Sequence, residues 1–283
     1  MSRAGFDIQR LSGAVGAEVS GLRLGAPLAA GVLRHLRRVW LEAGVIVARD
    51  QDLSPEQLLA FAGQWGEITR YPFLDGLPDC PQVIEVVKLE HETAAFGGVW
   101  HSDTNYLEAP AMATVLLARQ TPPAGGDTLF ACQVAAFAAL SDGMQRLLRP
   151  LKGVNSSGKA EITRTREDRL RQAGGDGAGE TFEAVHPVVR RHPETGREAL
   201  YVNPAHTVRF EGMSEAESAP LLEQLFAHQV RPEFTCRVSW RPGTLAMWDN
   251  RRLLHLPIND YDGHRRVMHR VSIAGDRPVG TAG

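Results

Sequence analysis

The chain has 283 residues, of which 43% are hydrophobic and 23% are charged, and its formal net charge at pH 7 is −2. This composition is typical of a globular protein and excludes collagen, a coiled coil and an extensively disordered chain. The near-neutral charge also argues against nucleic acid as a partner, because general nucleic-acid binding normally needs a basic surface.

The three cysteines, Cys80, Cys132 and Cys236, are widely spaced and form no CxxC pair. An odd number of isolated cysteines predicts neither a disulfide framework nor a thiolate zinc site. The first residues contain no apolar signal core, and no apolar run approaches the length of a membrane span. We therefore expect a cytoplasmic protein that has no membrane partner.

The N-terminal half alternates β-branched runs with helical patterns. A helix is predicted over residues 28–42, where apolar residues recur at helical spacing until Gly44. A second helix is predicted to start at Ser54, because Ser54 and Gln57 can form a capping box and proline is favoured at the first helical position. A third helical pattern covers residues 134–148, with a break near 141–143. Strands are predicted at residues 6–25 (a strand or hairpin), 45–48, 83–87, 113–118 and 128–130.

A polar, glycine-rich stretch covers residues 156–181 and contains hardly any apolar side chain. It predicts either a disordered surface insertion or a lid over a binding site, because long loops in compact domains are often binding loops. We take the lid to cover about 153–184. It does not separate two domains, because residues needed for one site lie on both sides of it, so residues 1–283 are expected to form a single domain.

The C-terminal part combines short strands with one helix. Ser214 and Glu217 predict a capping box at the start of that helix. Many short strands separated by turns are typical of an antiparallel barrel or sandwich. The strands are predicted at residues 187–189, 200–202, 236–240, 244–248 and 266–273.

The sequence Trp100-His101-Ser102-Asp103 contains a His-x-Asp pair, a pattern that occurs about once by chance at this composition. A second pair, His192-Pro193-Glu194, lies in a Pro/Gly turn and is interpreted as structural. The first pair gains weight from residues near the C-terminus, where His255 is followed by Arg266.

One His-x-Asp pair, one distant histidine and one later arginine form a chemically meaningful set. Two imidazoles and a carboxylate on one face of Fe(II) leave three coordination positions open. The keto acid 2-oxoglutarate can fill two of these positions, its far carboxylate suits a guanidinium group, and O2 can take the last position.

With these motifs, the chain resembles the taurine/2,4-dichlorophenoxyacetate dioxygenase family of Fe(II)- and 2-oxoglutarate-dependent oxygenases. The resemblance covers nearly the whole length, since several motifs appear in family order. It implies a mainly β fold with flanking helices, built on a double-stranded β-helix (jelly-roll, cupin-like) core. The motifs are Gly44-Val45-Ile46-Val47, Trp100-His101-Ser102-Asp103, Gly125-Gly126-Asp127-Thr128, Val202-Asn203 and Gly275-Asp276.

The resemblance also implies roles for single residues. His101, Asp103 and His255 would bind the metal; His264 and His269 are not excluded by position, and only family register selects His255. Arg266 would hold the far carboxylate of 2-oxoglutarate, with a hydroxyl bond from Thr128. Without the resemblance, a surface ion pair would be the simpler interpretation of Arg266.

Arg270 lies four residues after Arg266, so strand alternation puts both on one face. We count Arg270 with the co-substrate site and also with the substrate site, where it would bind an anionic head group. The expected reaction is hydroxylation of a small anionic organic substrate, with release of succinate and CO2.

The expected substrate site departs from the taurine dioxygenases of this family. Positions that hold polar or amine-binding residues in those enzymes here carry Tyr71, Leu74, Phe96 and Gly97, and His206 replaces a phenylalanine. An ammonium group left without partners in a dry site is strongly disfavoured. Taurine is therefore predicted to be a poor substrate, and an aryloxyalkanoate, an alkyl sulfate or a longer alkylsulfonate a better one.

Two alternatives use the same residues differently. A non-oxidative jelly-roll lyase or sugar-binding module would keep the metal ligands but need no 2-oxoglutarate, and a pure binding protein would need no reaction. Related enzymes form homodimers or homotetramers, and we expect one of these assemblies.

Overall fold

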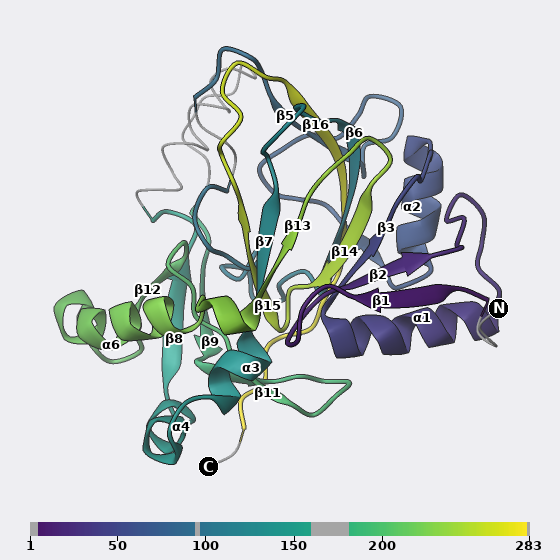
Figure 1. Ribbon diagram of the computed structural model, residues 1–283. Helices are drawn as coiled ribbons and strands as arrows, with labels where there is room; N and C mark the ends of the chain where they lie inside the picture. Colours follow the sequence, from purple (N-terminus) through teal and green to yellow (C-terminus); the bar gives the residue numbers. More distant parts are fainter. Residues whose placement is uncertain (1–4, 94–96, 160–180, 282–283) are drawn as a thin grey trace.

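The computed structural model of the chain describes residues 5–93, 97–159 and 181–281. Its centre is a large antiparallel sheet with one parallel strand pair, β2 with β3 (Figure 1). The strand order is β1-β2-β3-β14-β6-β16-β4, and β5 also pairs with β16. The strands are β1 (Asp7–Arg10), β2 (Ala17–Ser20), β3 (Val45–Ala48), β4 (Ile68–Thr69), β5 (Ile84–Lys88), β6 (Ala113–Gln120), β14 (Leu245–Asp249) and β16 (Arg266–Ile273).

A smaller sheet faces the large one. It has the order β13-β7-β15 and consists of β13 (Thr235–Val238), β7 (Thr128–Cys132) and β15 (Leu253–Pro257). One buried cluster lies between the two sheets, since Phe130 and Val238 of the small sheet share it with Ala246 and Met268 of the large sheet. The two facing sheets confirm the predicted jelly-roll core with flanking helices.

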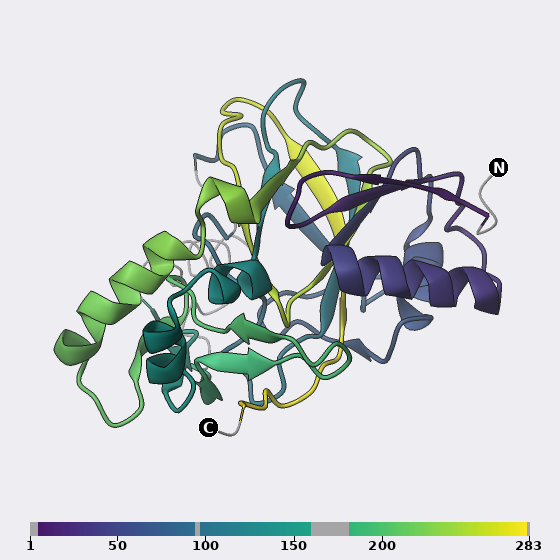
Figure 2. The ribbon, with the colours of Figure 1, turned by 60° about the horizontal axis from the view of Figure 1, so that its bottom comes forward.

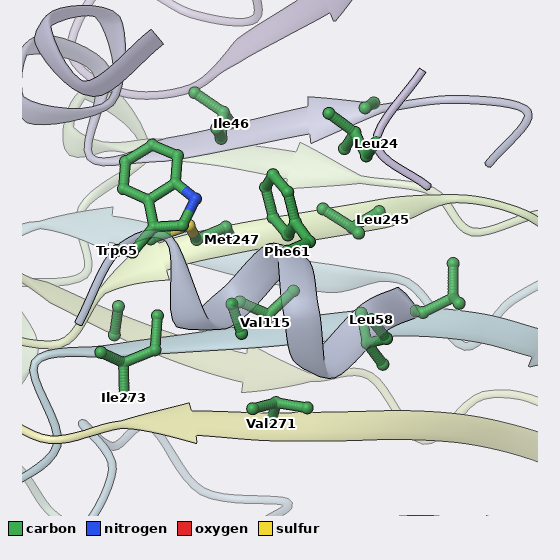
Figure 3. Packing of buried hydrophobic residues seen from close by; sticks show 14 of the residues in the cluster. Leu24, Ile46, Leu58, Phe61, Trp65, Val115, Leu245, Met247, Val271 and Ile273 are labelled. Atoms are coloured by element: carbon green, nitrogen blue, oxygen red, sulfur yellow. The ribbon is translucent and has the colours of Figure 1, made fainter. Parts of the chain in front are cut away.

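Two helices cover the outer face of the large sheet: α1 (Ala30–Ala43) and α2 (Pro55–Gly63). Phe61 and Trp65 pack against sheet side chains that include Val115 and Met247 (Figure 3). The predicted C-terminal end of α1 and the predicted start of α2 are confirmed. Gly44 caps α1 with φ of 78°, a conformation that favours glycine, and Ser54 forms the capping box of α2.

A third group of elements packs beside the small sheet and forms the lobe at the lower left of Figures 1 and 2. The helical pattern predicted over 134–148 with a break near 141–143 is two helices, and Ser141 caps the second of them. The group contains α3 (Gln133–Ala138), α4 (Asp142–Leu148), α6 (Glu215–His228), the 3₁₀ turn η1 (Pro232–Phe234), the sheet β12 (Thr207–Phe210), β8 (Lys152–Ser156) and β9 (Glu183–Pro187), and the hairpin β10 (Val189–Arg191) with β11 (Glu198–Leu200).

The predicted lid begins and ends in paired strands. Strand β8 runs antiparallel to β9, with Gly153 opposite His186 and Ser156 opposite Glu183. The first and last residues of the range 153–184 are therefore part of a sheet, while residues 160–180 lie outside the described residues. Among the helices of the described part of the chain, none is both long and apolar enough to cross a membrane.

Candidate metal and co-substrate site

His101 and His255 are neighbours through their main chains. The amide of His255 donates to the carbonyl of His101 at 2.8 Å, and the amide of His101 donates back at 3.1 Å. This antiparallel bridge adds His101 to the free edge of β15, whose other edge pairs with β7. The two imidazole rings consequently lie with their centres 4.1 Å apart.

Asp103 completes a compact cluster with the two histidines. Its Oδ1 lies 3.7 Å from His101 Nε2 and 3.9 Å from His255 Nε2. The three side chains are buried, and their candidate ligand atoms all lie within 4.8 Å of one another. Two imidazoles and one carboxylate at these separations can hold a divalent transition metal from one side.

Neighbouring groups orient these side chains. Nδ1 of His101 lies 2.7 Å from the carbonyl oxygen of Val99, which can only accept a hydrogen bond, so Nδ1 carries the proton and Nε2 is left to bind a metal. The ring of His255 packs against Trp248, with centres 4.8 Å apart, and against Phe130 at 6.1 Å.

The carboxylate of Asp103 belongs to a buried hydrogen-bond network. Thr114 Oγ1 donates to Asp103 Oδ2 at 2.6 Å, and Asn250 Nδ2 donates to Thr114 Oγ1 at 3.0 Å. Trp248 Nε1 in turn donates to Asn250 Oδ1 at 2.9 Å. Sequence reasoning did not find Thr114 or Asn250, because threonine and asparagine carry no metal-site signal of their own.

The protonation states in the cluster suit a metal. Burial lowers the pKa of both His101 and His255, so both imidazoles are neutral near pH 7. Burial opposes ionisation of Asp103, but Arg270, the two histidines and the Thr114 hydroxyl hold the pKa of its carboxyl well below the usual range. Neutral imidazole and ionised carboxylate are the forms that bind metal ions.

Arg266 and Thr128, predicted to bind the co-substrate, meet around Trp240. The indole Nε1 of Trp240 donates to Thr128 Oγ1 at 3.0 Å, and the guanidinium carbon of Arg266 lies 5.7 Å from the centre of the Trp240 ring. Arg266 is 7% exposed, and burial lowers its pKa. Its Nε and Nη2 make no hydrogen bond within the described residues, so they can serve an incoming carboxylate.

Arg270 faces the same interior as Arg266, since Met268 between them lies in the core between the sheets. Its Nη2 lies 3.0 Å from Asp103 Oδ1, and its guanidinium carbon lies 4.9 Å from the centre of the Tyr71 ring. Arg270 is therefore a positive charge directly beside the candidate metal cluster.

The residues predicted to contact substrate lie in two places. Tyr71 and Leu74 line a cavity of about 630 Å³. His206 lies near the metal cluster, with its ring centre 6.3 Å from that of His101. Gly97 lies against His101: a Cβ added there would lie 2.8 Å from Cε1 of that ring, and φ is +78°. Phe96 lies outside the described residues.

Three aromatic side chains that were not predicted, Phe73, Phe182 and Tyr106, lie between the cavity and His206. Phe73 and Phe182, which also line the cavity, have ring centres 5.6 Å apart. The ring centre of Tyr106 lies 5.7 Å from that of Phe73 and 4.9 Å from that of His206. They come from three distant segments and share no spacing pattern. We call Phe73, Tyr106, Phe182 and His206 the aromatic wall.

The family model described as "Taurine catabolism dioxygenase TauD, TfdA family" matches residues 7–272. The chain is 31% identical to an alpha-ketoglutarate-dependent sulfate ester dioxygenase of Pseudomonas putida, over 98% of this chain and 92% of that protein. It is 32% identical to the (S)-phenoxypropionate/alpha-ketoglutarate-dioxygenase of Sphingobium herbicidovorans, over 98% of both chains.

Solved structures agree with these sequence matches. A putative alpha-ketoglutarate-dependent taurine dioxygenase from Burkholderia xenovorans has a TM-score of 0.85 and 34% identity, over 98% of this chain and 96% of that chain. The protein AAD-2, solved in complex with Mn(II) and N-oxalylglycine, has a TM-score of 0.78 and 30% identity, over 98% and 99%. The chain therefore belongs to the TauD, TfdA family and is an Fe(II)- and 2-oxoglutarate-dependent dioxygenase (2-oxoglutarate is alpha-ketoglutarate).

Proposed function

We propose that His101, Asp103 and His255 hold the ferrous ion, and that the enzyme oxidises a small organic acid with an apolar body beside it. The observation that carries this proposal is the buried cluster of the three side chains, with ligand atoms within 4.8 Å of one another. When bound there, the iron supplies the activation of O2, coupled to the conversion of 2-oxoglutarate to succinate and CO2.

Arg266 binds the far carboxylate of 2-oxoglutarate in this proposal, and Thr128 adds a hydrogen bond. The oxygen of Thr128 already accepts the indole proton of Trp240, so the hydroxyl proton is free to be donated to an anionic oxygen. The guanidinium group of Arg266 is buried, where charge-assisted hydrogen bonds are strong. The two residues would fix the length of the keto acid that fits.

Arg270 binds the acid group of the primary substrate in this proposal. It is buried, 3.0 Å from Asp103 and over the ring of Tyr71, so a sulfate or carboxylate there would lie beside the metal cluster. A guanidinium group can bind such an anion through two hydrogen bonds. The carbon attached to the acid group would then be the one nearest the oxidising centre.

The body of the substrate would lie along the aromatic wall. Phe73, Phe182 and Leu74 line the adjacent cavity and offer apolar contacts, while the carboxylate in its lining belongs to the exposed Asp75. The relatives named above act on sulfate esters and on phenoxypropionate, acids with organic bodies. We therefore propose alkyl sulfates, aryloxyalkanoates or longer alkylsulfonates as substrates, and taurine as a poor one.

The segment at about 153–184 is proposed to act as the lid of this site. Phe182 supports this proposal, because it belongs to that segment and packs against Phe73 and Tyr106 of the aromatic wall. A segment that closes on these rings would exclude water from the reacting centre.

An anaerobic titration of the metal-free protein with Fe(II) and 2-oxoglutarate tests the proposed ligands. We expect a visible charge-transfer band from the iron chelate, lost in His101→Ala and needing far more 2-oxoglutarate in Arg266→Lys. A wild-type band that survives His101→Ala would contradict the ligand assignment. Substrate-dependent release of succinate then ranks the acids, and equal turnover of taurine and an alkyl sulfate would contradict the substrate proposal.

A cytoplasmic location and a homodimeric or homotetrameric assembly stay proposals. Cys80, Cys132 and Cys236 are buried free thiols, which supports a reducing compartment. Sedimentation of the purified protein would determine the assembly.

A further inference from the structure

Lys88 lies directly opposite Arg266. It is the last residue of β5, and the two residues are partners in the antiparallel pairing of β5 with β16. Directly opposed residues of an antiparallel pair project from the same face of the sheet. Glu85 and His269 form a neighbouring pair whose alternation puts them on the other face, where they lie 3.7 Å apart. Lys88 and Arg266 therefore both face the interior.

The amine of Lys88 is buried and poorly paired. Its side chain is 3% exposed, and Nζ makes no hydrogen bond to any described residue. The nearest charge is Oδ1 of Asp262 at 3.7 Å, on a side chain that is 78% exposed, and the amine lies 4.4 Å from the centre of the Tyr261 ring. A buried ammonium group without hydrogen bonds is costly, so a ligand that supplies an anionic oxygen would be bound favourably.

Gly126 connects Lys88 with the co-substrate site. A Cβ added at Gly126 would lie 3.3 Å from the ring of Tyr261 and 3.4 Å from Cδ of Arg266. The ring that lies beneath the amine of Lys88 therefore also lies beside the side chain of Arg266. Two buried cations, each with unused donors, therefore lie near one ring.

We propose that Lys88 is a second cationic residue of the co-substrate site, which attracts the far carboxylate of 2-oxoglutarate together with Arg266. This inference rests on the proposed binding of that carboxylate at Arg266. Its consequence is selectivity, because two positive charges favour a keto acid with a terminal carboxylate over one without it. Lys88 acts on co-substrate binding and takes no part in the oxidation itself.

The test compares two keto acids in the anaerobic iron titration: 2-oxoglutarate, and 2-oxobutyrate, which has the same chelating end and no far carboxylate. In Lys88→Met, the dissociation constant of 2-oxoglutarate should rise by about 10- to 100-fold, as expected for a charge-assisted interaction. The constant for 2-oxobutyrate should stay unchanged. An equal change for both acids, or none for either, would overturn the inference.

Three variants make the outcome decisive. Lys152→Met removes an exposed lysine that pairs with Glu211 and should leave both constants unchanged. Lys88→Gln replaces Lys88→Met if the latter does not fold. Arg266→Met separates this inference from the proposed function: if Arg266→Met discriminates between the two acids as wild type does, the carboxylate site itself is wrong. If only Arg266→Met loses the discrimination, Lys88 has no part in it.

Discussion

Thr114 donates a hydrogen bond of 2.6 Å to Oδ2 of Asp103, and this bond decides which carboxylate oxygen faces the histidines. The other oxygen, Oδ1, is the one near both imidazoles and Arg270. Thr114 itself accepts a hydrogen bond from Asn250, so its own proton is directed to Asp103. The orientation of Asp103 thus depends on Thr114 of β6 and on Asn250, which directly follows the paired strand β14.

Removal of the Thr114 hydroxyl should weaken metal binding. In Thr114→Val, Asp103 loses the hydrogen bond that orients it, and we expect the affinity for Fe(II) to fall by about 10- to 100-fold. Anaerobic metal titration measures the effect. Ser272→Ala is a matched control, because Ser272 is the cross-strand partner of Thr114 and its buried hydroxyl has no hydrogen bond among the described residues. A comparable loss in the control would contradict the orienting role.

Trp240 should affect co-substrate binding only through Thr128. Trp240→Phe removes the indole N–H that fixes the Thr128 hydroxyl, and the dissociation constant of 2-oxoglutarate should rise about fivefold, the usual value of one neutral hydrogen bond. In a Thr128→Val background the same substitution should have almost no further effect. Additive effects of the two substitutions would instead indicate that Trp240 acts through its stacking with Arg266.

Phe73 should determine which acids are accepted. In Phe73→Ala, the cavity beside the aromatic wall widens, and kcat/KM for a phenoxyalkanoate should fall about tenfold because an apolar contact is lost. A short ester such as ethyl sulfate, which does not reach this ring, should be oxidised at the wild-type rate. Succinate release measures both. A parallel loss for the two acids would mean that Phe73 supports the fold and not specificity.

Asp249 should make the stability of the protein acid-sensitive. His192 Nε2 lies 2.9 Å from one carboxylate oxygen, and Arg251 donates hydrogen bonds to both oxygens at 2.8 Å. Burial opposes ionisation of Asp249, but Arg251 and His192 more than offset it and hold its pKa well below the ordinary value. A lowered pKa in the folded state stabilises the protein above the unfolded value of about 3.9, and this contribution is lost as the pH falls further.

Urea unfolding of the metal-free protein tests this prediction. Asp249→Asn should lower the free energy of unfolding at pH 7 by about 3 kcal/mol, because the buried Arg251 loses its buried carboxylate partner and keeps only the pairing with the half-buried Glu194. The variant should also lose less stability than wild type between pH 4 and pH 3, values set by the unfolded pKa of about 3.9. Asp50→Asn, which removes an exposed partner of Arg241, should change stability by less than about 1 kcal/mol.

Local patterns were enough to predict most elements. The glycine that ends α1 and the capping boxes of α2 and α6 are short-range features, and the structure has all three. The turn at His192-Pro193-Glu194 is also confirmed, since Gly196 donates its amide to the carbonyl of His192. The strands β4, β8, β12 and β15 and most of β9 were missed by the pattern. Their partners lie far along the chain, and β8 begins with Lys152 and contains a glycine and an asparagine, which do not indicate a strand.

The metal cluster could be predicted only with the family resemblance, because a His-x-Asp pair occurs about once by chance and its spacing does not select His255. The structure brings those three side chains together. Thr114 and Phe73 are ordinary residue types, and only strand pairing and loop packing reveal their positions. Lys88 ends an apolar run and would be expected in solvent; its burial depends on Tyr261, from a loop more than a hundred residues later.

The main-chain bridge between His101 and His255 has an evolutionary consequence. The two histidines are held side by side by a pair of peptide hydrogen bonds, which do not depend on side-chain identity, while the aromatic wall that would contact the substrate is made of the side chains of Phe73, Tyr106, Phe182 and His206. Substitutions in that wall leave the peptide pair intact. New acids can therefore be accommodated by gradual mutation without passing through ancestors that have lost their metal.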